Sequence, residues 1–508
     1  MRATALPLVA LLAAVLGVEP ALADVTVRVE RGSDHAERIR VRMLGGYRSS
    51  IVLQDAYAID LAGTVFEKRF YLDHRLRVGP ELDIHGRVFV GVELDLLTGL
   101  LGGHLPDTET AWDERLRWDA SGLRHAEFRQ AYLRVHGERA VLEAGLLTDH
   151  WGLGAVVNDG GPDGDGFGDD PFGTDAFGDR VLRVGVNVTP ALPGGTFGYV
   201  QVQLMLDLVA LDERTHLIDG GELALGPGLR VLYDTPLARA GGWLAWRTLR
   251  TRDGATAELL TADLFVDRWL PLGRRDARFH IAAELAGEVG RTSLEAGWPV
   301  EPDRTALRGA AVLDGGIEVA GAPLLFGLRA GLVSGDPDPT DGTDTGFSLD
   351  RDFNVGLILF DEVLAGVGAR AAVQVEELTG RDASALAREG GIGGGLFALP
   401  YLSYRPHPYV DLRLGGLLAA APTGIGAVQP VVGGLEGLFT AAGSPLLGGE
   451  LDVAVTLEVP VVPAAQQRTR FGIRLEYGHL FPGPALTEGW SEAVGGVDLF
   501  ATRMGLTF

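Results

Sequence analysis

Polar and apolar residues alternate with a period of two in many segments of the chain. In residues 84–96, IHGRVFVGVELDL, apolar side chains occupy one parity and most of the charged side chains occupy the other. The same alternation recurs in residues 199–208, 451–459 and 470–478. A period of two is typical of a β-strand with one apolar and one polar face. The sequence therefore predicts an all-β protein.

Two kinds of β-protein fit half-apolar strands, a soluble sandwich and a membrane barrel, and they differ in where the apolar face points. Many of the alternating segments reach the roughly 9–11 residues that a tilted strand needs to cross a bilayer. The polar parity carries full charges, which suits a wet interior. We therefore expect a single antiparallel transmembrane β-barrel of roughly 16–18 strands with long acidic loops.

The first residues predict export. Residues 1–23 contain a short uncharged run that ends in Ala-Leu-Ala, as in a cleaved signal peptide, and the run is too short to span a bilayer. Residues 24–69 are expected to be an N-terminal extension or the first hairpin, and residues 70–508 the barrel. The chain ends in Phe508 after alternating apolar residues. This ending resembles the C-terminal signature of bacterial outer-membrane barrels, which implies recognition by their insertion machinery.

Composition narrows the classes of function. The net charge of −24 would repel the phosphates of nucleic acids, so no nucleic-acid partner is expected. The chain has no cysteine, which excludes disulfides, thiolate chemistry and cysteine-ligated metals. The expected setting is the outer membrane, with lipid as the surrounding partner.

Part of the chain resembles known barrels. The block 127–184 holds a strand at 130–135 (QAYLRV) and a turn at 151–154 (WGLG), and a second block has SGDPD at 334–338 followed by FNVGLILF at 353–360. These features resemble uncharacterised outer-membrane porin-like proteins and, more loosely, the alginate-export channels. The resemblance implies a barrel, but the chain lacks the dense arginine conduit of an alginate exporter, so polysaccharide export is not implied.

The stretch 150–179, which contains HWGLGAVVNDGGPDGDGFGDDPFG, leaves three interpretations open. Its carboxylates suit calcium, which takes six to eight oxygen ligands. The stretch could equally be a solvated acidic loop, or it could fold into the lumen and face arginines of the inner wall, which would set ionic selectivity. A phosphate site is excluded because the aspartates would repel an anion. The candidate calcium ligands are Asp163, Asp165, Asp169 and Asp170.

The charged parity of the predicted strands gives the candidate pore-lining residues. They are Arg87, Glu93, Arg183, Arg413, Arg470, Arg474 and Glu476. Aromatic residues near segment ends, Trp151 among them, are candidates for the interfacial girdles of a barrel or for ordinary packing.

No catalytic constellation emerges from the sequence. His150 and Asp149 are adjacent, and adjacent strand residues point to opposite faces. His280 and Glu284 lie four strand residues apart, which separates them by over a dozen ångströms at a rise of ~3.3 Å per residue. The expected function is an outer-membrane porin-like channel for small hydrophilic solutes, without enzymatic activity or a required cofactor. The alternatives are a plugged structural or adhesive barrel with calcium-stabilised loops, and a soluble sandwich.

Overall fold

The computed structural model describes most of the chain. The described residues are 24–25, 39–67, 70–103, 124–161, 170–173, 178–190, 199–212, 215–217, 221–252, 254–273, 277–294, 304–319, 322–337, 341–371, 391–422, 444–461, 469–488, 490 and 493–507. Among them no helix is long and apolar enough to cross a membrane.

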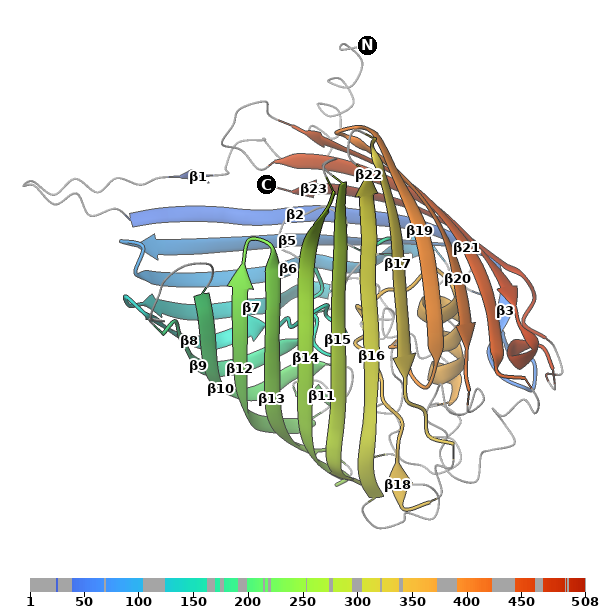
Figure 1. Cartoon of the computed structure of the whole chain (residues 1–508), viewed down its shortest axis with the longest axis horizontal. Helices are drawn as coiled ribbons and strands as arrows, with labels where there is room; N and C mark the ends of the chain where they lie inside the picture. Colours follow the sequence, from blue (N-terminus) through green and yellow to red (C-terminus); the bar gives the residue numbers. More distant parts are fainter. Residues whose placement is uncertain are drawn as a thin grey trace, which may run out of the picture.

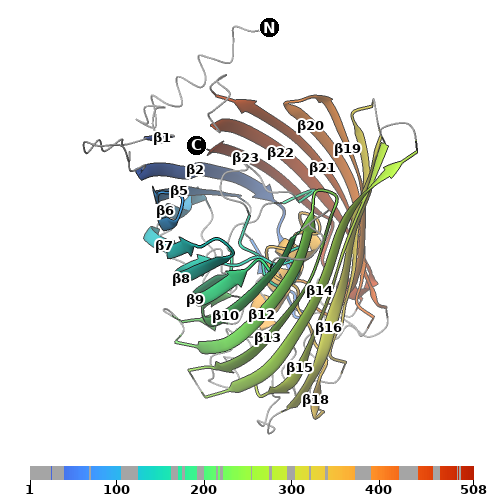
Figure 2. The ribbon, with the colours of Figure 1, turned by 60° about the vertical axis from the view of Figure 1, so that its left-hand side comes forward.

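In the described part of the chain, eighteen antiparallel strands close into one barrel. Figures 1 and 2 show the curved wall that they form. The strands are β2 (Ile39–Gln54), β5 (Phe70–Ile84), β6 (Val88–Gly103), β7 (Arg124–His136), β8 (Ala140–Thr148), β9 (Arg180–Val188), β10 (Tyr199–Asp212), β12 (Leu223–Thr235), β13 (Ala238–Arg250), β14 (Thr256–Leu272), β15 (Ala277–Thr292), β16 (Arg304–Val319), β17 (Leu324–Val333), β19 (Leu396–His407), β20 (Val410–Ala420), β21 (Leu446–Pro460), β22 (Arg470–Pro482) and β23 (Val497–Thr507).

Each barrel strand pairs with the next along the chain, and β23 pairs with β2 to close the wall. Closure leaves no unpaired edge, which a strand-based membrane protein requires. The strand count lies within the predicted range of 16–18. The wall begins at Ile39, inside the range 24–69 that the sequence left open. Strand β2 pairs with β5 and, over two residues, with the short strand β1 (Asp24–Val25).

The two rims of the barrel differ in the length of their connections. Tight turns join the strands at one rim, here called the short-turn rim; they include residues 85–87, 137–139, 236–237 and 408–409. Long connections join them at the other, the long-loop rim; they include residues 104–123, 149–179, 334–395 and 421–445. In outer-membrane barrels short turns face the periplasm and long loops face outward.

The wall is apolar outside and polar inside. Strand β14 shows this clearly: Leu264 is 61% exposed on the outer face, whereas its neighbour Asp263 is fully buried on the inner face. Exposed leucine, valine and aromatic side chains recur at alternate positions around the barrel. A soluble sandwich would have the opposite arrangement, so the third alternative is wrong and this wall faces lipid.

Segments of the long connections fold into the lumen and build a core there. They are residues 55–67, with the small hairpin β3 (Tyr57–Ala58) and β4 (Val65–Phe66), and the described parts of 149–179, 334–371 and 483–496. Their buried side chains include Ile59, Phe172, Phe353, Ile358 and Leu486, which belong to one cluster with Leu399, Leu417 and Leu499 of the inner wall. The helical turn η1 (Leu359–Leu364) and the helix that continues it lie inside the barrel in Figure 2. The lumen is therefore narrowed from the long-loop rim.

Candidate functional site in the lumen

Trp151 anchors the described part of residues 149–179, here called the first lumenal segment, to the inner wall. Its indole Nε1 donates a hydrogen bond of 3.2 Å to Asp263 of β14, and its ring meets that of Phe265 edge-on at 5.3 Å. The backbone N–H of Leu153 donates to Glu284 of β15. The interpretation of Trp151 as an interfacial marker is wrong, because the side chain is 6% exposed and points at inner-wall residues. The sequence alone does not predict this anchor, because the carboxylates that receive it lie more than a hundred residues away.

Asp149 joins the segment to two further strands. Its carboxylate accepts hydrogen bonds from Arg183 of β9 and from Arg230 of β12, at 2.7–3.1 Å. Burial acts to raise the pKa of Asp149, but the positive charges of Arg230 and Arg183 outweigh it, and the net effect is a pKa well below the ordinary value. Asp149 is therefore a buried anion shared by two cations.

A second carboxylate holds another lumenal segment. Asp60, which follows β3, accepts the backbone N–H and hydroxyl of Thr64 at 2.8 and 2.6 Å and the Nε of Arg370 at 3.1 Å. Burial raises its pKa, but the hydrogen bonds from Thr64, with the charge of Arg370, lower the pKa overall. The pair ties residues 55–67 to the lumenal helix.

The lowered pKa values of Asp149 and Asp60 predict an acid-sensitive lumen. Their stabilising effect is complete well above the ordinary aspartate pKa of about 3.9 and is lost as the pH falls through the lower folded-state values. We expect single-channel recordings at constant salt to be the same at pH 7 and pH 5 and to become progressively noisier as the pH falls below about 3, toward the folded-state pKa values, as the segments loosen. Recordings that do not change down to about pH 2 would contradict this.

The second half of the loop reaches the opposite wall. Phe172 is 1% exposed and packs where Gly415 of β20 leaves room, since a Cβ there would come within 2.4 Å of the ring. Gly173 donates its N–H to Glu476 at 3.1 Å and accepts from Arg474 at 3.0 Å. The described parts of the loop thus span the lumen from β12–β15 to β20–β22. This agrees with the interpretation that residues 150–179 fold into the lumen.

The first lumenal segment contacts the described part of residues 334–371, here called the second lumenal segment. Asn158 donates its backbone N–H to Asp350 at 2.8 Å, and Gly178 donates to Asp352 at 2.7 Å. Farther along, Glu450 of β21 accepts the backbone N–H groups of residues 357, 358 and 359 at 2.6–2.8 Å. One inner-wall carboxylate therefore fixes the start of the lumenal helix.

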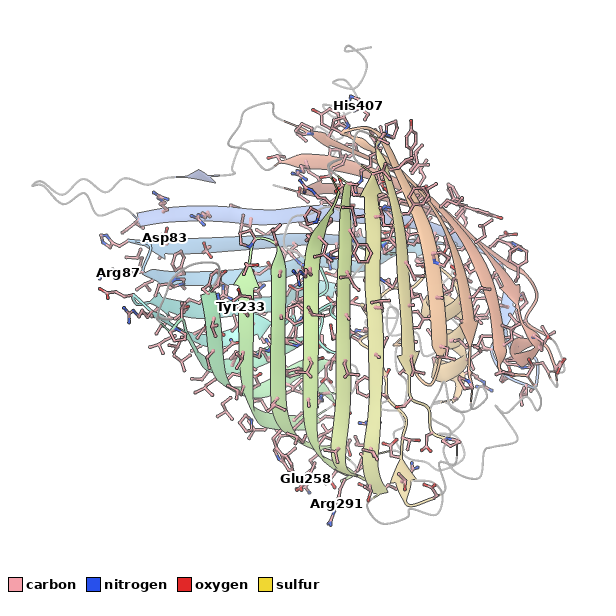
Figure 3. All side chains as sticks on the ribbon, in the orientation of Figure 1. Asp83, Arg87, Tyr233, Glu258, Arg291 and His407 are labelled. Carbon is pink, nitrogen blue, oxygen red and sulfur yellow. The ribbon has the colours of Figure 1, made fainter. Side chains whose placement is uncertain are left out.

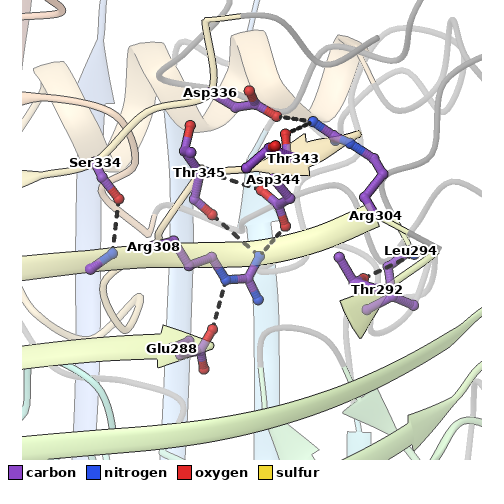
Figure 4. Close-up of polar contacts among 12 residues, drawn as sticks. Glu288, Thr292, Leu294, Arg304, Arg308, Ser334, Asp336, Thr343, Asp344 and Thr345 are labelled. Carbon is purple, nitrogen blue, oxygen red and sulfur yellow. Dashed lines mark hydrogen bonds and ion pairs between the residues drawn. The ribbon is translucent and has the colours of Figure 1, made fainter. Parts of the chain in front are cut away.

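Arginines of β16 hold the beginning of this second segment (Figure 4). Arg308 donates to Glu288 of β15 and to Asp344, both at 2.7 Å, and Arg304 donates to Asp336 at 2.6 Å. The short strand β18 (Thr343–Asp344) pairs with β16 at this point. Asp336 and Asp344 of this loop are thus engaged by arginine.

The structure distributes the candidate pore-lining residues between the wall and one rim. Those on the inner wall are Glu93, Arg183, Arg413, Arg474 and Glu476. Arg470 is at the short-turn rim, where it donates to Glu458 at 2.9 Å. Arg87 lies in the exposed β5–β6 turn at the same rim (Figure 3), away from the loop it was expected to oppose. Positive φ at His85 and Gly86 makes this turn tight.

The candidate calcium ligands lie mostly outside the described residues. Asp163, Asp165 and Asp169 are among those not described. Asp170 is described: its carboxylate accepts from Arg329 and, at 3.1 Å, from Asn354. The described part of the chain holds no group of three or more acidic or histidine side chains suited to a metal ion. Calcium binding by this loop stays a prediction.

The two histidine pairs weighed in the sequence do not form. Asp149 binds arginines, and the Nδ1 of His150 lies 3.6 Å from Asp159. His280 lies 2.9 Å from Asp267 and stacks on Trp269, at a ring separation of 4.5 Å.

A cavity remains between the loops and one side of the wall. Its lining comes from β9, β10 and β12–β15 on the wall side, and from residues 156–157 and 347–350 on the loop side. Its volume is about 140 Å³, and it opens to solvent. The cavity lies beside the lumenal core and is the candidate place for a solute.

Fold and wall together define the class: a transmembrane β-barrel with the architecture of outer-membrane porins. No family model and no curated protein matches the sequence. Among solved structures, Pseudomonas aeruginosa OccK9 (OpdG) is similar at 12% identity, with 92% of this chain and 98% of that chain covered and a TM-score of 0.51.

Pseudomonas aeruginosa OccK8 (OprE) is similar at 10% identity, with 92% and 98% covered and a TM-score of 0.49. Acinetobacter baumannii OccAB1 is similar at 9% identity, with 92% and 97% covered and a TM-score of 0.47. At these identities the likeness concerns the fold alone. The looser likeness to alginate-export channels is not supported.

Proposed function

We propose that this protein is an outer-membrane channel for small hydrophilic solutes, and that its lumenal segments narrow the path without sealing it. The cavity beside those segments carries the proposal, because it is lined by charged side chains and opens to solvent, whereas segments that sealed the barrel would leave no such space along the wall. Ion pairs such as Arg77 with Asp95, at 2.7 Å, line the inner wall and suit a water-filled interior.

Export by residues 1–23 and recognition of Phe508 by the insertion machinery belong to the same proposal. Transport through such a lumen needs no chemistry on the solute. The apolar core inside the lumen favours the second candidate, a plugged structural barrel, because packed side chains exclude water.

Planar bilayers distinguish the two candidates. Purified protein that is folded, as judged by heat-modifiable migration in gels, is added to a bilayer in potassium chloride. We expect stepwise current increases, each from one inserted barrel. A bilayer that stays silent with folded, inserted protein would contradict the channel and favour the plugged barrel.

A further inference from the structure

The cavity beside the lumenal segments has a lining in which carboxylates outnumber arginines. Six acidic residues contribute to it, and Arg247 of β13 is the one basic residue among its lining residues in the described part of the chain. The acidic residues are Asp149, Asp179, Asp207, Asp212, Glu288 and Asp350. Their charge is only partly balanced within the lining, because Arg247 pairs with Asp212 at 2.6 Å.

Two other arginines near the cavity stand behind the carboxylates they bind. In the pair of Arg183 with Asp207, the arginine side chain is 4% exposed and the aspartate 18%. In the pair of Arg308 with Glu288, the values are 1% and 15%. Neither arginine lines the cavity. A solute in the cavity therefore meets the negative side of both ion pairs.

Most of the rest of the lining is apolar or aromatic. Trp243 of β13, Met205 of β10 and Phe347 of the second lumenal segment contribute to it. Arg230 already lies over the ring of Trp243, 5.0 Å from its centroid, so these side chains offer apolar contact to a solute. Carboxylates next to such an apolar surface suit a positive group attached to a short hydrocarbon body and disfavour an anion.

The geometry points to a binding site in this cavity for small organic cations, ammonium or guanidinium compounds with a short apolar body, on their way through the channel. This inference rests on the proposed function and specifies its solute. Asp207 and Glu288 attract the positive group, and the aromatic and methionine side chains contact the hydrocarbon part. The remaining ion pairs keep the wall in place while a solute passes.

The test uses matched ions and two conservative variants. Reversal potentials are measured in a gradient of butylammonium butyrate, whose cation and anion have the same chain length. The variants are Asp207→Asn and Glu288→Gln. Each leaves the arginine behind it with a second carboxylate, since Arg183 still binds Asp149 and Arg308 still binds Asp344.

We expect the wild-type channel to prefer butylammonium over butyrate. Each variant should reduce that preference about threefold, in line with a partly exposed ion pair of up to about 1 kcal/mol. The matched control is Asp314→Asn on β16. It removes the same charge from a residue outside the cavity lining, and Arg329 still binds Asp170. The control should keep the wild-type preference.

Three results would overturn the inference. They are equal passage of both ions, a preference for butyrate, and a loss of preference in Asp314→Asn as large as in the cavity variants. In each of these cases, a current in potassium chloride would still support the proposed channel function. Folded protein that carries no current in potassium chloride would instead refute the proposed function, and this inference with it.

Discussion

Asp149→Asn is expected to detach the first lumenal segment from the wall. The substitution keeps the side chain's size but removes the anion that Arg183 and Arg230 share, and it puts an N–H donor against one of them. Removing one partner of a buried ion pair costs about 3–5 kcal/mol. Hydrogen exchange of the amides of Trp151 and Gly154, bonded within the loop, should therefore accelerate roughly 100-fold to 4000-fold.

A second-site change and a control sharpen this prediction. Arg230→Gln added to Asp149→Asn removes one of the unbalanced cations and should restore part of the protection. Asp234→Asn, on the same strand as Arg230, affects only exposed contacts, with Arg239 at 3.9 Å and with the Tyr199 hydroxyl at 3.2 Å, and should alter exchange very little. Protection unchanged in Asp149→Asn would mean that the ion pairs do not hold the loop.

The barrel could be predicted from the sequence because its strands carry a local signal. Apolar and polar residues alternate in residues 451–459 of β21 and 470–478 of β22, and the structure places the apolar parity on the more exposed face of both. The first strand of the wall was harder to recognise, because Gly45 and Gly46 interrupt the alternation of β2. The pairing of that strand with β23, at the far end of the chain, has no local signal at all.

The lumenal site could be predicted only in outline. Glycines and aspartates identified 150–179 as an unusual connection, and its length allowed a lumenal position. Which wall residues receive it depends on strands far apart in sequence, such as the one that carries Asp263. Trp151 was misread because an aromatic residue at a strand end is equally compatible with a membrane interface and with a lumenal contact.

Arg87 was predicted to line the pore, but it lies at the rim of the barrel. Its parity is that of the inner face, but the tight turn begins at His85, so the side chain belongs to the rim rather than to the wall. Parity gives the face of a residue and not its depth in the membrane. To predict the depth of a residue, one must know where its strand ends, and the alternation of residues does not show this.

Glu450→Gln is expected to release the start of the lumenal helix. The carboxylate accepts three backbone N–H groups, two at Oε1 and that of Leu359 at Oε2, and Glu450 is 3% exposed. Glutamine puts an amide N–H where Leu359 needs an acceptor and removes the charge from the other two bonds. Because a hydrogen bond to a charged group contributes about 1.5–3 kcal/mol, the loss should amount to at least about 2 kcal/mol.

The release should appear in two measurements. Hydrogen exchange of the amides of residues 357–359 should speed up roughly 30-fold or more, the factor that corresponds to about 2 kcal/mol. Single-channel currents should become larger or noisier, because the helix lies in the lumen. Glu458→Gln on the same strand is the matched control: its pair with Arg470 at the short-turn rim is 33% and 54% exposed, so its loss should change neither measurement. Equal effects of the two substitutions would show that Glu450 acts through the overall charge of β21 rather than by binding the helix.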